Sequence, residues 1–172
     1  EYTVQELGLR SPSIRDDVNA NVSLGINSNS QGQQNTALGY QSMTSNSSSS
    51  NNSSNTAVGY FALQKGGTNC TAVGWTAGDQ QSGSDNIWIG YAAGGGTNPL
   101  SGANQNVAIG SNALLAISNN SASNNVCVGY NSGTALTTGG NNTLVGNSSA
   151  AGAVGGIYQI VLGSSATGTG NN

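Results

Sequence analysis

The sequence predicts an all-β fold, a parallel β-solenoid of about nine coils. A short apolar segment that ends in glycine recurs nine times, as in Asn55-Thr56-Ala57-Val58-Gly59-Tyr60, and the glycines of successive copies lie 14 to 20 residues apart. Only 5% of the residues are charged, whereas about a quarter are charged in an ordinary globular domain. A strand-like repeat at this period is typical of a solenoid. The copies are Asn21–Gly25, Asn35–Gly39, Asn55–Gly59, Cys70–Gly74, Asn86–Gly90, Asn106–Gly110, Asn125–Gly129, Asn142–Gly146 and Gln159–Gly163.

Two positions of each copy share one face of the predicted strand. The residue before the glycine is aliphatic in every copy, and the residue two places earlier is β-branched in every copy, as Ile109 and Val107 illustrate. Residues two apart in a strand point to the same side. We therefore assign both positions to the interior of the solenoid. On this assignment Ile109→Asp would place an unpaired charge in a narrow core and disrupt several coils.

The position between these two is apolar in eight of the nine copies. On the same assignment it faces outward, where a solvated sheet would carry polar residues. Nothing else in the chain is available to cover it, so we expect a second copy of the chain to do so. The alternative is that alanine is tolerated on an exposed face. The candidate trimer interface is Ala57, Trp88, Ala108, Leu144 and Val161.

The polar residues of the repeat suit its corners. Glycine at the end of each copy permits a positive φ or a close backbone approach. Asparagine at the head of most copies tolerates left-handed geometry and can bond to its own backbone. An aromatic residue often follows the glycine and would stack into a column, either as packing at a coil corner or subunit boundary or as a strip for sugar rings. The candidate receptor or glycan contacts are Tyr40, Tyr60, Trp75, Tyr91 and Tyr130.

The chain divides into three parts. Residues 1–20 hold six of the nine charges and form an N-terminal cap or an attachment arm, residues 21–166 form the repeat domain, and residues 167–172 form a frayed tail. Excursions at 43–54, 94–105 and 116–124 absorb the uneven coil lengths, and they are expected to protrude on one side. Glycosylation at the scattered Asn-x-Ser/Thr triplets is not expected, because so much asparagine and serine produces them by chance.

Composition excludes several functions. The chain has no histidine, and Asp79 and Asp85 are the only carboxylates after residue 20, so we expect no enzyme, no cofactor and no metal site. No basic cluster suits nucleic acid, and no apolar run could insert in a membrane. Cys70 and Cys127 fall about three coils apart, too far for a disulfide, and are expected to be free. An interrupted threonine column argues against an ice-binding plane.

Three copies carry a resemblance to known repeat families. Asn35-Thr36-Ala37-Leu38-Gly39-Tyr40, Asn55-Thr56-Ala57-Val58-Gly59-Tyr60 and Asn106-Val107-Ala108-Ile109-Gly110 resemble the head repeats of trimeric autotransporter adhesins and the similar repeats of phage and large-virus fibre proteins. The resemblance covers about 85% of the chain and implies a left-handed parallel β-roll assembled as a homotrimer.

The resemblance also implies an extracellular setting. The coils are less regular than those of the bacterial family, and no neck, heptad stalk or membrane anchor follows Gly163 in the sequence. We therefore expect a structural fibre or projection on a virion surface, with attachment to the particle through residues 1–20 and receptor binding to a host glycan or protein as an additional role. The alternative is a bacterial surface adhesin head of the autotransporter type.

Overall fold

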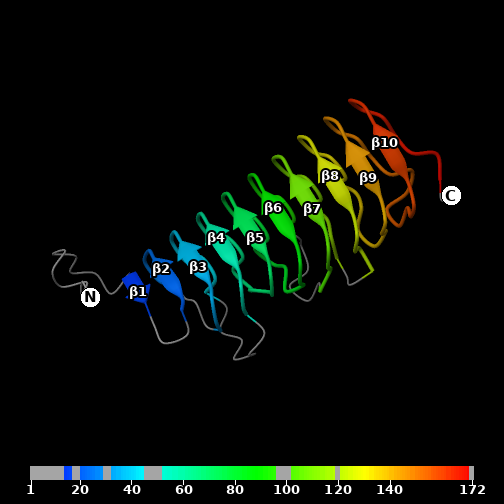
Figure 1. Cartoon of the computed structure of the whole chain (residues 1–172). Helices are drawn as coiled ribbons and strands as arrows, with labels where there is room; N and C mark the ends of the chain where they lie inside the picture. The colour runs from blue at the N-terminus through cyan, green and yellow to red at the C-terminus, as the bar shows by residue number, and fades with distance from the viewer. Residues whose placement is uncertain are drawn as a thin grey trace.

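The structure is a β-solenoid built on one ten-stranded sheet. The computed structural model describes residues 14–16, 20–28, 32–44, 52–95, 102–118 and 121–170, and these contain short strands and turns but no helix. The strands follow one another in chain order from one end of the molecule to the other (Figure 1). They are β1 (Ile14–Asp16), β2 (Val22–Leu24), β3 (Thr36–Leu38), β4 (Thr56–Val58), β5 (Thr71–Val73), β6 (Ile87–Ile89), β7 (Val107–Ile109), β8 (Val126–Val128), β9 (Thr143–Val145) and β10 (Ile160–Leu162).

The nine repeat strands, β2 to β10, are all parallel, and they pair so that equivalent positions of successive copies lie opposite one another. Ala57 in β4, for example, pairs with Ala37 in β3 and with Ala72 in β5. Unequal coil lengths therefore do not shift the register, because the connecting segments absorb the extra residues. The predicted all-β solenoid with one strand per copy is confirmed. Parts of the three predicted excursions, at 45–51, 96–101 and 119–120, lie outside the described residues.

Residues on both sides of the predicted repeat domain, 21–166, pair with the ends of the stack. Strand β1 pairs antiparallel with β2, so three residues of the N-terminal arm cover the edge of the first coil. The rest of residues 1–19 lies outside the described residues. At the other end Thr167, the first residue of the predicted tail, pairs with Ala150, and the Gly168 N–H donates to the Ala150 carbonyl at 2.9 Å. Residues 171 and 172 lie outside the described residues.

The interior is lined by the middle residue of each strand, which corrects the predicted orientation. In β6, Trp88 is fully buried while its neighbours Ile87 and Ile89 are 39% and 38% exposed. The same pattern holds in every repeat strand from β2 to β10. The coil is narrow, so small side chains such as alanine suit its interior, and the bulky aliphatic residues point out. Ile109 is 38% exposed, and Ile109→Asp is therefore not a core substitution.

Core volume is balanced across each coil. The largest interior side chain, Trp88, lies against Gly78 and Gly94, where a Cβ atom would come within 3.0 Å of the indole ring. Ala57 and Ala108 are instead followed six residues later by a buried leucine, Leu63 or Leu114. Ala72 is followed by Gly78, which makes room for Trp88 of the next coil. A large residue on one wall of the coil is thus matched by a small residue on the other, as a close-packed interior requires.

A column of buried asparagines, here called the asparagine ladder, joins successive coils. In seven of the eight steps the backbone N–H of a ladder residue donates to the side-chain oxygen of the ladder residue one coil earlier, at 2.9–3.1 Å, and in the remaining step the N–H of Asn86 donates to the sulfur of Cys70. The side-chain NH₂ of several members donates to a carbonyl three residues before the next ladder residue, as from Asn142 to Gly156 at 2.7 Å. The next coil therefore satisfies both ends of the amide. The ladder comprises Asn21, Asn35, Asn55, Cys70, Asn86, Asn106, Asn125, Asn142 and Gln159.

The repeat glycines form a second column of close contacts. Gly110 has a φ of +130°, and a Cβ atom there would lie 2.5 Å from the carbonyl oxygen of Gly129 in the next coil. Both predicted reasons for glycine, a positive φ and a close backbone approach, therefore apply. The residue before each ladder position has a φ near +60°, as at Asn124 and Asn141. The ladder residues themselves have no positive φ, so the left-handed geometry predicted for them lies one residue earlier.

Gly110→Ala should destabilise the fold by about 4 kcal/mol or more, because it adds both backbone strain and a collision with Gly129. Gly163→Ala is the matched control. Gly163 has a φ of +127°, but its nearest neighbour for a Cβ is Ala166 Cβ at 3.8 Å. The control should lose only the strain, about 1–3 kcal/mol. Urea unfolding followed by circular dichroism measures both, and equal losses would contradict the close-approach account.

Cys70→Asn should stabilise the protein. Cys70 interrupts the ladder, and its sulfur accepts the backbone N–H of Asn86 and lies 3.3 Å from the Gly83 carbonyl oxygen. An asparagine would supply a stronger oxygen acceptor to Asn86 and a donor to Gly83, for a gain of about 1 kcal/mol and roughly 2–4 °C in Tm. Cys127→Asn is the control, because it places an amide in the apolar core and should lower Tm. A fall in Tm for both variants would refute the ladder.

Candidate interaction surface

The outer face of the sheet carries two columns of aliphatic and threonine side chains, here called the flanking columns. They consist of the first and third residue of every repeat strand. Figure 1 shows the strands side by side along the whole stack, so the columns run its full length. The large hydrophobic members with exposed side chains are Val22, Leu24, Val73, Ile87, Ile89, Ile109, Val145, Ile160 and Leu162.

The flanking columns form a strip of the size at which exposed apolar surface is often functional. Nine strands about 4.8 Å apart and two residues in register give a strip roughly 40 Å long and 10 Å wide, or about 400 Å². The largest apolar patch on a typical monomer covers about 300–600 Å² and is often functional. The flanking columns are therefore the main candidate surface of the described chain.

The predicted interface residues are not on this surface. Ala57, Trp88, Ala108 and Leu144 are fully buried, and Val161 is 5% exposed, all within the core of a single chain. They cannot contact a second copy without unfolding their own coil. The predicted orientation of the strands is therefore reversed. The residues assigned to the core lie on the outer face and form its apolar surface. The need for a covered apolar face is unchanged, but different residues supply it.

The predicted aromatic column exists for four of its five members. The rings of Tyr40, Tyr60, Trp75 and Tyr91 stack in successive coils, with centroids 5.2, 5.8 and 4.8 Å apart and planes within 10° of parallel. Phe61 adds an edge contact to Tyr60 at 4.2 Å. Each of the four stacked rings directly follows a repeat glycine. The aromatic column therefore lies beside the flanking column that the third strand residues form.

Stacking changes what the aromatic column can bind. A sugar ring packs on the flat face of an aromatic side chain. Trp75, however, has Tyr60 on one face and Tyr91 on the other, so its edge is the part left to solvent. Tyr130 lies beyond a coil that carries Ser111 in this position, and no ring contact involves it among the described residues. The geometry favours packing over a continuous sugar-binding strip.

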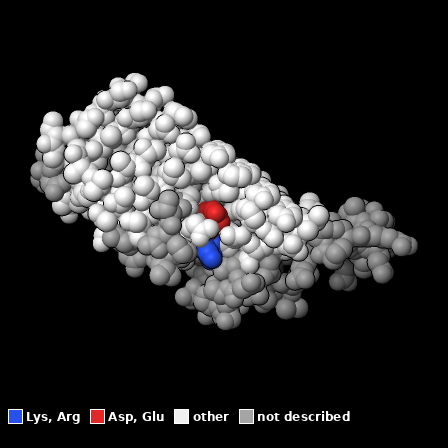
Figure 2. Space-filling model, turned by 180° about the vertical axis from the view of Figure 1, so that it is seen from behind, with Lys and Arg blue, Asp and Glu red and all other residues white. Residues whose placement is uncertain are grey.

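Charged groups are sparse on the described surface, and the face in Figure 2 is almost entirely uncharged. Asp79 is half-buried, and desolvation raises the pKa of its carboxyl above the usual value, although a hydrogen bond from Gln80 and the charge of Lys65 act in the opposite direction. Asp85 accepts a hydrogen bond from the Asn69 side chain at 3.0 Å. Within the described residues no three metal-binding side chains cluster.

The two cysteines are free and buried, as expected. Burial raises the pKa of Cys127 to about 12, despite a hydrogen bond with Ser132 that lowers it. Burial likewise raises the pKa of Cys70. Both thiols are therefore protonated near neutral pH, which does not suit a nucleophile or a metal ligand.

Comparisons of the chain with protein-family models, curated proteins and solved structures found no match. In the part of the chain that the structure describes, no helix could cross a membrane. The flanking columns and the aromatic column are thus interpreted from their own geometry.

Trp75→Ala should lower the free energy of unfolding by about 1–3 kcal/mol, because it removes two stacked ring pairs. Tyr130→Ala removes an exposed ring that has no such neighbour in the described chain and should cost less than about 1 kcal/mol. Chemical denaturation of the two variants under identical conditions makes the comparison. If Tyr130→Ala costs as much as Trp75→Ala, stacking is not what stabilises the column.

Proposed function

We propose that this chain is a structural fibre or projection protein of a virion, and that it functions as a homotrimer joined through the flanking columns. The observation that supports this proposal is the strip of aliphatic and threonine side chains along the outer face of β2 to β10. Side chains such as Ile89 and Ile109, each 38% exposed, repeat along its whole length. Burying such a strip between copies would remove it from water at a gain of roughly 25 cal/mol per Å².

A second copy of the chain is the best-matched partner for this strip. The coil spacing is fixed by the sheet, so copies aligned in parallel would present columns of equal length and identical repeat. A small, charged or nucleic-acid partner would not match a neutral surface about 40 Å long. Three copies around an axis parallel to the stack are what the resemblance to fibre and adhesin repeats implies.

The shape and the arm support a projecting role. The termini of the stack lie at opposite ends of an elongated body (Figure 1). Residues 1–20 carry most of the charge, and β1 within them lies at one end of the stack. In this proposal the arm attaches the trimer to its particle and the far end points outward into the extracellular space. Host-receptor binding through the aromatic column is less well supported, since ring faces such as those of Trp75 are covered.

The same assembly could serve as the head of a bacterial surface adhesin, which is the alternative that the repeat resemblance keeps. Antibody labelling of intact particles and intact cells separates the two. Label at regular positions on virions supports the fibre, whereas label on a bacterial surface overturns the virion assignment.

Ile109→Asp should abolish association and leave the fold of the single chain intact. The side chain lies on the outer face, so a charge is tolerated in the monomer but would be buried and unpaired three times in a trimer. Light scattering should report a mass near the 17.0 kDa of one chain, with an unchanged circular dichroism spectrum.

Two matched variants define the interpretation of that experiment. Ala108→Asp, one residue earlier, charges a fully buried position and should unfold the coils. Gln105→Asp charges an exposed residue off the strand and should leave both fold and mass unchanged. If Ile109→Asp keeps the mass of the wild type, the flanking columns are not the interface.

A further inference from the structure

The aromatic column is interrupted at Ser111, in the middle of the stack. Tyr91 ends the run of four stacked rings, the next coil carries Ser111 in the same position, and the coil after that carries Tyr130. Backbone hydrogen bonds keep these positions in register. The Asn112 N–H donates to the Tyr91 carbonyl at 2.8 Å, and the Asn131 N–H donates to the Ser111 carbonyl at 3.0 Å. The serine therefore leaves a gap between two tyrosines, here called the Ser111 gap.

The Ser111 gap has the height of one ring. Successive coils are about 4.8 Å apart, so Tyr91 and Tyr130 lie roughly 10 Å from each other along the stack. Within the stacked run the ring centroids lie 4.8 to 5.8 Å apart. One ring placed midway in the gap would thus have the same spacing from both tyrosines. Ser111 is half-buried at the base of the gap, whereas Tyr91 and Tyr130 are 52% and 53% exposed.

Ring faces that stacking leaves uncovered border this gap. The planes of the stacked rings are within 10° of parallel, and their spacing is close to that of the coils, so their faces point along the stack. Trp75 covers one face of Tyr91, and the other face is directed toward Ser111. Tyr130 has no ring against either face among the described residues. The gap therefore offers two aromatic walls.

Polar groups lie at the base of the gap. The second residue after a repeat glycine packs beside the aromatic column, as the contact of Phe61 with Tyr60 at 4.2 Å shows. Asn112 and Asn131 hold that position in the two coils at the gap, and Nδ2 of Asn112 donates to Oδ1 of Asn131 at 3.1 Å. Among the described residues no other hydrogen bond engages these two amide side chains or the Ser111 hydroxyl. They can therefore bind a ligand.

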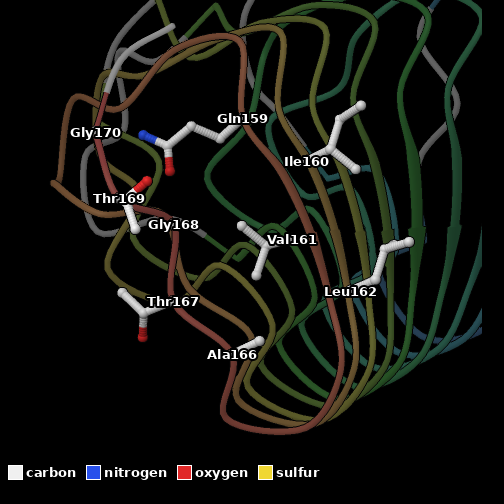
Figure 3. Close-up of a pocket in the computed structure, with 9 residues that line it drawn as sticks. All are labelled: Gln159, Ile160, Val161, Leu162, Ala166, Thr167, Gly168, Thr169 and Gly170. Carbon is white, nitrogen blue, oxygen red and sulfur yellow. The ribbon is translucent and has the colours of Figure 1, made fainter.

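The gap opens on the outer side of the coil. Figure 3 shows the outer face in the last coil, where Ile160 and Leu162 point to one side of β10 and Val161 points to the other. Ile109 of β7 occupies the position equivalent to Leu162, is 38% exposed and precedes Ser111 by two residues. The residues around the gap are uncharged, which suits a neutral ligand that arrives from solvent.

We propose that the Ser111 gap binds one neutral pyranose ring of a glycan, held between Tyr91 and Tyr130. A sugar ring packs its C–H faces on aromatic faces and carries oxygen atoms around its edge. These edge groups would pair with Ser111, Asn112 and Asn131. An aromatic ring from a protein would fill the same space but leave the polar groups unpaired, which costs about tenfold or more in affinity.

Two aromatic walls also select the stereochemistry of the sugar. In a β-glucopyranoside all ring substituents are equatorial, so axial C–H bonds make both faces apolar. An axial oxygen, as in galactose or in an α-linked glucose, would be pressed against one wall and lose its hydrogen bonds to water. The ligand class is therefore a β-linked pyranose of the gluco configuration. The site lies within one chain, so it depends neither on the homotrimer nor on the virion assignment.

The test titrates the full chain with methyl β-D-glucopyranoside and follows the backbone amides by NMR. The amides of Ser111, Asn112 and Asn131 should shift with a dissociation constant of roughly 1–10 mM. Magnetisation transferred from tyrosine ring protons should reach the axial protons on both faces of the sugar. Methyl β-D-galactopyranoside and methyl α-D-glucopyranoside carry an axial oxygen on opposite faces, and each should bind at least about tenfold more weakly.

Three variants of the chain complete the test. Tyr130→Ala removes one wall and should weaken glucoside binding at least about tenfold. Tyr158→Ala is its control, because it removes a 57% exposed ring outside the aromatic column and should leave binding unchanged. Ser111→Tyr supplies the absent ring. It should abolish binding and raise Tm by about 2 °C or more, because it adds two stacked pairs.

The proposal is overturned if the galactoside binds as tightly as the glucoside, or if Ser111→Tyr still binds the glucoside. Equal binding of benzyl alcohol would also overturn it, since the polar base of the gap would then play no part. The same holds if no amide at the gap shifts at about 100 mM glucoside. None of these outcomes bears on the oligomeric state, so the gap and the trimer are tested separately.

Discussion

The buried asparagine ladder is the interaction on which the rest of this structure depends. Each amide oxygen accepts the backbone N–H of the next ladder residue, at 2.9 Å between Asn106 and Asn125. The amide is buried, so leaving either of its ends unpaired would cost about 1–3 kcal/mol. The ladder therefore fixes each coil over its neighbour, whatever the length of the loop between them. With register fixed, the glycine column and the strand pairing follow.

Register in turn decides which side chains meet water. The coil is narrow enough that its wall accepts alanine at Ala57 and Ala108, and it takes Trp88 only where Gly78 and Gly94 make room. The larger aliphatic residues consequently face out and repeat along the sheet. An apolar strip of this kind is a by-product of a small core. It supports an assembly in which copies of the chain supply the burial that one chain cannot supply alone.

Much of the fold could be predicted from the sequence, but the orientation of the strands could not. The glycine period located all nine repeat strands, and the aromatic residues after glycine predicted the stack from Tyr40 to Tyr91. Alternation shows which residues share a face, but not which face is inside. Side-chain size predicts the opposite orientation, because Val and Ile are more often buried than Ala. The sequence does contain one sign of the true orientation. The middle residue of a strand and the residue six places later vary in size in opposite directions, as Trp88 with Gly94 and Ala57 with Leu63 show.

The most direct test of the account is the mass of the wild-type chain in solution. Sedimentation equilibrium across the micromolar range should give a single species of three times 17.0 kDa, about 51 kDa, because the flanking columns would be covered in a trimer. A species of 17.0 kDa with an intact β-sheet spectrum at the same concentrations would contradict the account, since the apolar strip would then be stable in water.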